Sequence, residues 1–188
     1  MKLLRMATLV IVVFATIQTV VSSQESIPYV PSTIPIVTKM LELASVTKDD
    51  LVYDMGCGDG RILIMAAKKY GARGVGIDLD PERIAEARKN AEQEGVSHLL
   101  EFRAEDGTKT DISKATVVTL YMFKWFNNAI RPKLQKLQPG SRVVAHDFDI
   151  DEWKPTSTVY LDSEKNGHEG IERPHTLFLW LVGAEQKP

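Results

Sequence analysis

The feature that most constrains this chain is a glycine-rich turn that directly follows a short apolar run. Residues 51–62 read LVYDMGCGDGRI, so an acid, Asp54, precedes glycines at every second position. A short apolar run is typical of a strand buried on both faces, and glycines allow positive φ angles and close approach of a ligand to the backbone. The turn therefore predicts an α/β fold with a small-molecule site at the carboxyl end of its first strand.

Strands and helices alternate along the rest of the folded part. Apolar residues recur at helical spacing in residues 36–44, 61–70, 81–94 and 127–137, and N-caps are expected at Ser32 or Thr33 and at Asn127. The expected strands are residues 51–55, 74–78, 99–103, 116–122, 141–148, 156–161 and 176–182. No helix separates the last two strands, which predicts a hairpin added at one edge of a parallel sheet.

The N-terminus has a composition of its own. Lys2 and Arg5 precede an uncharged apolar run over residues 7–21. A membrane-spanning helix needs about 20 residues, whereas the core of an export signal needs about 7–15. Residues 1–23 are therefore expected to be a signal peptide or an N-terminal membrane anchor, with an organelle-targeting segment as a third alternative. Residues 24–188 are the expected folded domain, which would be exported or anchored and could associate with a membrane through this segment.

Charge and cysteine content exclude several classes of protein. The net charge is −2, and it becomes −4 without residues 1–23, which disfavours general binding of nucleic acid. A single cysteine, Cys57, excludes an internal disulfide, and its place between glycines indicates a small packing residue rather than a nucleophile. We expect a monomer.

A packing role is expected for Trp125, Trp153 and Trp180.

The histidines do not predict a metal centre. His98, His168 and His175 show no spacing typical of metal ligands, so no metal is expected. His146 and Asp147 end the fifth strand, where structural hydrogen bonding is the expected role.

Two ligand classes compete for the glycine turn. A dinucleotide site has the pattern G-x-G-x-x-G, but its third glycine would fall at residue 61, which is Arg61. A negative Asp54 would repel a pyrophosphate and suits an ammonium group, which S-adenosylmethionine (SAM) carries together with a sulfonium. Asp78, at the end of the second strand, is placed for the ribose hydroxyls, Leu79 for the adenine face and Asp106 for the adenine amino group. Acids at three successive strand ends therefore favour SAM.

The motifs DMGCGDGR, GIDLDP and AEDG resemble those of the class I SAM-dependent methyltransferases, and the resemblance extends over about residues 28–182. It implies a Rossmann-like, doubly wound seven-stranded sheet, mostly parallel with an antiparallel last strand. It also implies SAM as the cofactor, bound by Asp54, Gly56, Gly58, Gly60 and the three residues named above.

A narrower resemblance concerns the substrate. PYVPST, LYMF and LQPGSRVVAHDF resemble segments of archaeal and mitochondrial protein-lysine methyltransferases, including those that act on the ATP synthase c-subunit and the adenine nucleotide translocase. This implies transfer of a methyl group to a protein lysine. The alternatives are a small-molecule methyltransferase and a SAM-binding module without catalysis. Enzymes that methylate base amines typically carry [DN]-P-P-[YF] after the fourth strand, and this chain has Leu-Tyr-Met-Phe there.

Two tyrosines are the candidate catalytic residues. Tyr121 follows the fourth strand, where the methyl acceptor should lie, and Tyr29 lies in the lead-in that could cover the pocket. We expect both to orient the acceptor amine and the methyl group. Aromatic packing against the edge of the sheet is the alternative role.

Overall fold

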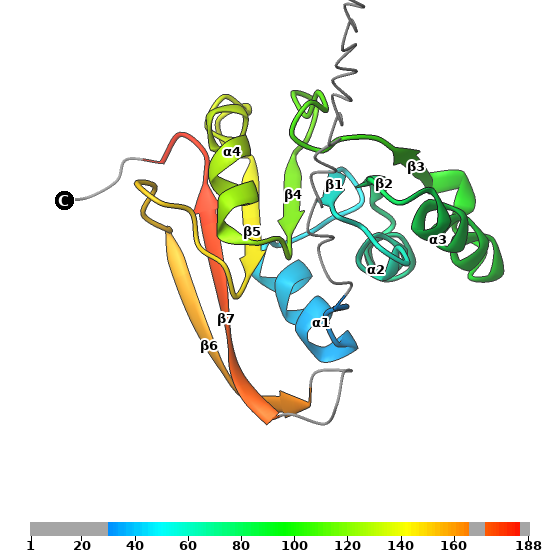
Figure 1. Ribbon diagram of the computed structural model, residues 1–188, viewed down its shortest axis with the longest axis horizontal. Helices are drawn as coiled ribbons and strands as arrows, with labels where there is room; N and C mark the ends of the chain where they lie inside the picture. The colour runs from blue at the N-terminus through cyan, green and yellow to red at the C-terminus, as the bar shows by residue number, and fades with distance from the viewer. Residues whose placement is uncertain (1–29, 166–171, 185–188) are drawn as a thin grey trace, which may run out of the picture.

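The structure is a computed structural model that describes residues 30–165 and 172–184 (Figure 1). The helices are α1 (Ile34–Leu43), α2 (Arg61–Tyr70), α3 (Pro81–Gln93) and α4 (Lys124–Leu134), with a 3₁₀ turn η1 (Ser97–Leu99). The strands are β1 (Leu51–Met55), β2 (Arg73–Asp78), β3 (Leu100–Ala104), β4 (Val117–Leu120), β5 (Arg142–His146), β6 (Ser157–Lys165) and β7 (Glu172–Leu181).

The seven strands form one sheet in the order β3-β2-β1-β4-β5-β7-β6. Strands β1 to β5 pair in parallel, and β7 runs antiparallel to both β5 and β6. This confirms the predicted doubly wound, mostly parallel sheet. Of the two hairpin strands, β7 lies between β5 and β6, and β6 forms the edge of the sheet. The strand order reverses between β1 and β4, and ligands bind at such a reversal in open α/β sheets.

Alternate residues of each central strand face two separate cores. Val52 and Val144 pack in the cluster that includes the apolar faces of α1, α2 and α3. Their neighbours Tyr53 and Val143 pack in a second cluster with α4 and the buried Trp180. Because both faces of the sheet are covered, the central strands are continuous apolar runs, as the sequence predicts.

The predicted cap at Asn127 is wrong, and the predicted cap at Ser32 or Thr33 is confirmed in position, at Thr33, but not in its side-chain bond. Helix α4 begins at Lys124, so Asn127 lies inside the helix, fully buried, and its side-chain amide donates to the Phe148 carbonyl at 3.0 Å. Helix α1 has Thr33 at its N-cap without a side-chain capping bond, and the Ser32 hydroxyl contacts His146 instead. In both cases a tertiary hydrogen bond takes the polar group that local spacing assigned to a cap.

The tryptophans divide into a buried pair and an exposed residue. Trp153 and Trp180 are buried with ring centroids 5.7 Å apart, and the Trp180 indole donates to the Trp153 carbonyl at 2.7 Å, which confirms their packing role. Trp125 is 57% exposed near the start of α4, and its packing is limited to an edge contact with the Phe126 ring, with centroids 5.8 Å apart. It lies on the first turn of an amphipathic helix, on the face away from the sheet.

Within residues 30–165 and 172–184, no helix is long and apolar enough to cross a membrane. The predicted signal or anchor over residues 1–23 and the candidate residues Tyr29 and His168 lie outside the described residues.

Candidate active site

The turn after β1 takes the shape for which its glycines are needed. Gly56, Gly58 and Gly60 all have positive φ angles, of 78°, 51° and 81°. A Cβ atom on Gly56 would lie 2.4 Å from the Met122 sulfur, so a side chain there would have to displace the Met122 side chain and would also be strained by the positive φ. Cys57 is buried between these glycines, and burial raises the pKa of its thiol, which confirms a packing role.

The backbone amides of this turn are already used within the protein. The Gly56 and Cys57 amides both donate to the Ile77 carbonyl, at 2.8 and 2.9 Å. The Gly58 amide donates to the Asp78 carboxylate at 2.9 Å. A phosphate-binding turn needs such amides free to donate to the ligand. The turn is therefore unsuited to the pyrophosphate of a dinucleotide, as the sequence indicates.

Asp54 lies near the end of β1, and one of its two carboxylate oxygens makes no hydrogen bond to the described residues. Its side chain is 2% exposed, and the Thr119 hydroxyl donates to Oδ1 at 2.6 Å. The other oxygen, Oδ2, has no hydrogen-bond partner among the described residues. Burial, helped by the nearby charge of Asp78, raises the pKa of Asp54 to about 7. A buried, unpaired carboxylate oxygen is costly, and an ammonium group placed against it would remove that cost.

Asp78 connects the end of β2 to the glycine turn. Its Oδ2 accepts from the Gly58 amide, and its Oδ1 accepts from the Asp80 amide at 3.0 Å. Each carboxylate oxygen has a second lone pair, so both can also accept a ribose hydroxyl. Leu79, beside it, is 65% exposed and offers an apolar surface for a flat base.

Asp106 lies in the loop after β3, where it holds the local backbone. Its Oδ1 accepts from the amide and hydroxyl of Thr108, and its Oδ2 forms an ion pair with Lys109 at 3.1 Å. These contacts, the Thr108 hydrogen bond first, lower the pKa of Asp106. The Glu105 amide donates to the Asp78 carbonyl at 2.9 Å, so the loop is joined to the ribose side of the site. The contact of Asp106 with the adenine amino group stays a prediction.

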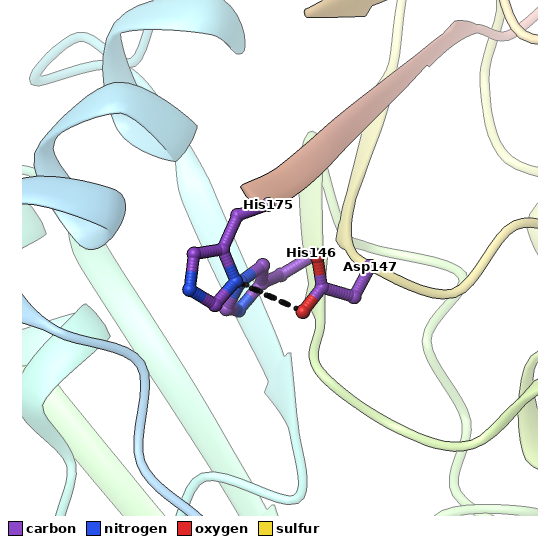
Figure 2. Close-up of side chains that lie close together, drawn as sticks. All are labelled: His146, Asp147 and His175. Atoms are coloured by element: carbon purple, nitrogen blue, oxygen red, sulfur yellow. Dashed lines mark hydrogen bonds and ion pairs between the residues drawn. The ribbon is translucent and has the colours of Figure 1, made fainter. Parts of the chain in front are cut away.

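Tyr121 lies directly after β4 and stacks on the ring of His146, with centroids 3.9 Å apart. His146 belongs to a group of three side chains with Asp147 and His175 (Figure 2). Phe148 lies next to Tyr121, at a centroid distance of 6.2 Å. Tyr121 and Phe148 therefore form an aromatic wall backed by a buried histidine, on the side of the sheet where the methyl acceptor is predicted to lie.

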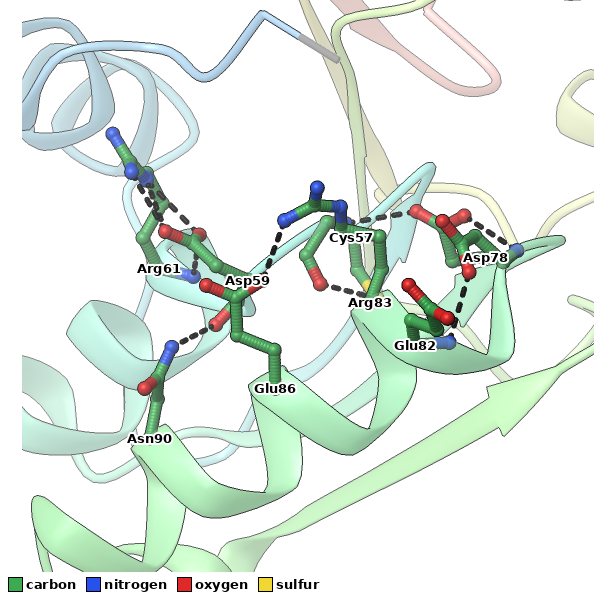
Figure 3. Close-up of polar contacts among 10 residues, drawn as sticks. Cys57, Asp59, Arg61, Asp78, Glu82, Arg83, Glu86 and Asn90 are labelled. Carbon is green, nitrogen blue, oxygen red and sulfur yellow. Dashed lines mark hydrogen bonds and ion pairs between the residues drawn. The ribbon is translucent and has the colours of Figure 1, made fainter. Parts of the chain in front are cut away.

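Three polar residues that hold the outer side of the turn had no predicted role. Arg61 pairs with the Asp59 carboxylate at 2.6 Å and donates to the Ser32 carbonyl at 2.9 Å. Asn90 reaches from α3 and donates to the Asp59 carbonyl at 3.0 Å (Figure 3). Arg61 therefore joins the cofactor turn to the segment before α1. The sequence did contain a sign of this role, because Arg61 occupies the position at which a dinucleotide-binding turn has its third glycine.

The fold and the site define a class I SAM-dependent methyltransferase. The fit to SAM follows from three features: the unpaired Oδ2 of Asp54 for the ammonium, the remaining acceptor capacity of Asp78 for the ribose, and the internal use of the turn amides that a phosphate would need. The profile of the ANTKMT methyltransferase domain matches residues 54–157, and the chain belongs to this family.

Similar proteins agree with this assignment. A protein-lysine N-methyltransferase of Saccharolobus islandicus is 41% identical over 162 residues, which cover 85% of this chain and 96% of the relative. A lysine N-methyltransferase of Xenopus laevis, named for the c-subunit of ATP synthase, is 35% identical over 130 residues, and the match spans 57% of that relative's length. A solved structure, described as an RNA methyltransferase from Salinibacter ruber with S-adenosyl-L-homocysteine, has a TM-score of 0.73 and 46% identity over 84% of this chain and 97% of its own.

Proposed function

We propose that this methyltransferase transfers the methyl group of SAM to the ε-amino group of a lysine in a protein. The observation that carries the proposal is the aromatic wall formed by Tyr121, directly after β4, and Phe148, after β5, with ring centroids 6.2 Å apart. The segment at the end of β4 reads Leu-Tyr-Met-Phe, where base-amine enzymes carry a polar residue followed by Pro-Pro. The protein-lysine methyltransferases among the relatives support the same substrate.

The chemistry requires a neutral lysine held in line with the transferred methyl group. SAM supplies that methyl group on a sulfonium; as the new N–C bond forms, the S–C bond breaks and its electron pair stays on sulfur. The free pKa of lysine is about 10.4, so the amine must lose a proton before it can attack. The Tyr121 wall excludes water from the amine, and desolvation lowers the pKa of a lysine. Positioning and desolvation are therefore the contributions of the protein.

Net charge favours a basic protein surface as the partner. Residues 24–188 carry a net charge of −4. On the rim formed by α4 and the loop after β5, Asp149 and Asp151 lie beside Lys124, at 2.9 and 2.7 Å, and Glu152 pairs with Arg131 at 3.0 Å, so these acids are matched by cations. A lysine-bearing protein is attracted to an acidic domain, whereas a phosphate backbone is not.

The test is methyl transfer from labelled SAM into a cell lysate, with the full chain as the enzyme. We expect label in protein, recovered as methyl-lysine after acid hydrolysis, and much less label with an Asp78→Ala variant at a low concentration of SAM. Label that nuclease removes and protease leaves would contradict the protein substrate and point to RNA. Label confined to small molecules would contradict it as well.

We further propose that residues 1–23 direct the protein out of the cytosol or hold it at a membrane. The support is the charge-flanked apolar run of residues 7–21. Because SAM is made in the cytosol, an anchor that leaves the domain there is compatible with turnover. Mass spectrometry of the protein from its host distinguishes the two forms: a mature chain starting near Gln24 indicates cleavage, and an intact Met1 in the membrane fraction indicates an anchor.

A further inference from the structure

Three side chains that no step of methyl transfer uses converge behind the aromatic wall. His146 ends β5, Asp147 follows it, and His175 comes from β7, which is paired antiparallel to β5 (Figure 2). His146 Nε2 lies 2.9 Å from His175 Nδ1, His175 Nδ1 lies 3.0 Å from Asp147 Oδ2, and His146 Nε2 lies 3.3 Å from Asp147 Oδ2. The three atoms form a nearly equilateral triangle, and both imidazoles are buried.

Hydrogen bonds alone do not satisfy this triangle while Asp147 is ionised. A proton on His175 Nδ1 leaves the lone pairs of His146 Nε2 and Asp147 Oδ2 facing each other. A proton on His146 Nε2 instead leaves His175 Nδ1 facing the carboxylate. With both nitrogens protonated, two N–H donors oppose each other at 2.9 Å. Every arrangement of protons therefore leaves one repulsive edge, because an imidazole nitrogen is either a donor or an acceptor.

A single cation removes all three repulsions, and the dimensions suit one. Metal–ligand bonds of about 2.0–2.2 Å place neighbouring ligand atoms about 3.3 Å apart in a tetrahedral site and about 3.0 Å apart in an octahedral one. The observed edges of 2.9, 3.0 and 3.3 Å span this range. Two imidazoles and one carboxylate favour a transition-metal ion such as Zn²⁺ over Mg²⁺ or Ca²⁺.

The surrounding hydrogen bonds orient two of the three ligands as metal sites require. The Ser32 hydroxyl lies 2.9 Å from His146 Nδ1, so a proton on Nδ1 can be donated to it, which leaves Nε2 with its lone pair toward the triangle. The Thr176 amide donates to Asp147 Oδ1 at 2.9 Å, which leaves Oδ2 for the ion. His175 Nε2 has no hydrogen-bond partner among the described residues, so Nδ1 is the nitrogen of that ring with polar contacts.

We propose that His146, Asp147 and His175 bind one divalent transition-metal ion of the Zn²⁺ type. The expectation of no metal rested on histidine spacing along the chain, and it missed a site whose ligands come from two strands that are adjacent only in the sheet. The ion joins the ends of β5 and β7 and fixes the imidazole on which Tyr121 stacks. Three protein ligands leave at least one coordination position for water.

The test measures Zn²⁺ binding to the full chain after chelator treatment and removal of any purification tag. Competition with a chromophoric chelator gives the affinity, and elemental analysis gives the stoichiometry. We expect one Zn²⁺ per chain. His175→Ala should weaken binding by about 100-fold or more, and Ser32→Ala by about 10–100-fold, as expected for a residue that orients a ligand. Co²⁺ in place of Zn²⁺ should give a visible absorption band that His175→Ala abolishes.

Two further variants make the result decisive. Asp147→Asn keeps an acceptor for the Thr176 amide and tolerates the positive φ of 61° at this position, so it removes the charge without removing the turn. It should weaken Zn²⁺ binding even if His175→Ala fails to fold. The matched control is His98→Ala, which removes an exposed histidine of η1 and should leave binding unchanged. Absence of Zn²⁺ binding by the wild-type chain, or equal affinity in Asp147→Asn and the wild type, overturns the proposal.

Discussion

The predicted cofactor and acceptor halves of the candidate site are built in different ways. The cofactor half consists of the turn after β1 and the end of β2, and main-chain hydrogen bonds such as that from Gly56 to Ile77 hold it. The acceptor half consists of side chains from separate segments: the Tyr121 ring stacks on His146, and the His146 ring in turn contacts the Ser32 hydroxyl. One half is a shape of the backbone, and the other is a network of side chains.

The difference has consequences for substitution. In the cofactor half, Asp54 and Asp78 are each predicted to make a ligand contact with a single carboxylate, and main-chain hydrogen bonds fix the backbone around them. In the acceptor half, each side chain positions the next one. We therefore expect cofactor-half variants to change the affinity for SAM, and acceptor-half variants to change the rate of transfer while leaving that affinity nearly constant.

The largest effect should come from Tyr121→Ala. Removal of the ring opens the acceptor wall to water and lets the amine move, and a misplacement of about 1 Å costs about 100-fold in rate. S-adenosyl-L-homocysteine binding should change by less than about threefold, because Asp54 and Asp78 are untouched. The measurements are labelled methyl transfer under saturating SAM and calorimetry.

The matched control for that variant is Tyr160→Ala. Tyr160 is 80% exposed on β6, so its removal deletes the same side chain away from the crevice. Equal losses of rate in the two variants would contradict the positioning role of Tyr121, and a parallel loss of cofactor affinity would remove the distinction between the two halves.

The second effect is on the cofactor half. Asp78→Ala removes a charged acceptor, and hydrogen bonds to charged groups are worth about 1.5–3 kcal/mol, so the affinity for S-adenosyl-L-homocysteine should fall by about 10–100-fold. Asp80→Ala is the control, since the Asp80 side chain caps α3 through the Glu82 amide and lies outside the predicted ribose contact. It should cost about 1 kcal/mol of stability with the affinity unchanged. Unchanged affinity in a folded Asp78→Ala protein would assign the ribose to another residue.

The third effect depends on pH and concerns Asp54. Its pKa of about 7 lies above the ordinary value of 3.8, so the folded protein without ligand holds a proton that the unfolded chain releases. The stabilising contribution of this proton is complete below about pH 4 and is lost as the pH rises through about 7. An ammonium ligand prefers the ionised form. Affinity for S-adenosyl-L-homocysteine should therefore rise about tenfold between about pH 6 and pH 8.

Asp54→Asn should abolish both pH dependences. The amide keeps an oxygen for the Thr119 hydroxyl and does not ionise. The binding affinity and the free energy of unfolding should therefore no longer vary with pH around neutrality. Calorimetry in buffers of different ionisation enthalpy should show proton release on binding by the wild-type protein alone. Persistence of the pH dependence in Asp54→Asn would assign it to another group.

The cofactor half could be predicted from the sequence because its parts are contiguous. Asp54 and the three glycines lie within seven residues, and Asp78 ends the next strand, so the turn and the candidate cofactor site could be inferred together. The fold was predictable for the same reason, since each strand and helix has its own apolar period. Local sequence patterns predict these features because neighbouring residues determine the conformation of the backbone between them.

The acceptor half could be predicted only in part. Tyr121 follows from its place after β4, but the group formed by His146, Asp147 and His175 depends on the pairing of β5 with β7. Asn127 and Ser32 show the same limit, because each has a local use as a cap and a tertiary use that the chain adopts. Side-chain partners that lie far apart in sequence leave no periodic signal.

The smallest expected effect sharpens the boundary of the acceptor half. Trp125 is 57% exposed at the start of α4, on the rim formed by α4 and the loop after β5, next to Lys124, which pairs with Asp149 and Asp151. If the rim receives a protein, Trp125→Ala should raise the protein concentration needed for half-maximal labelling by about 2–5-fold, the range of a peripheral contact worth less than about 1 kcal/mol. The maximal rate and the affinity for S-adenosyl-L-homocysteine should not change, and stability should stay within about 0.5 kcal/mol because the ring is outside the core. A free lysine-containing peptide too short to reach α4 should be methylated equally by both proteins. An equal effect on the short peptide would place Trp125 inside the acceptor half rather than on its rim.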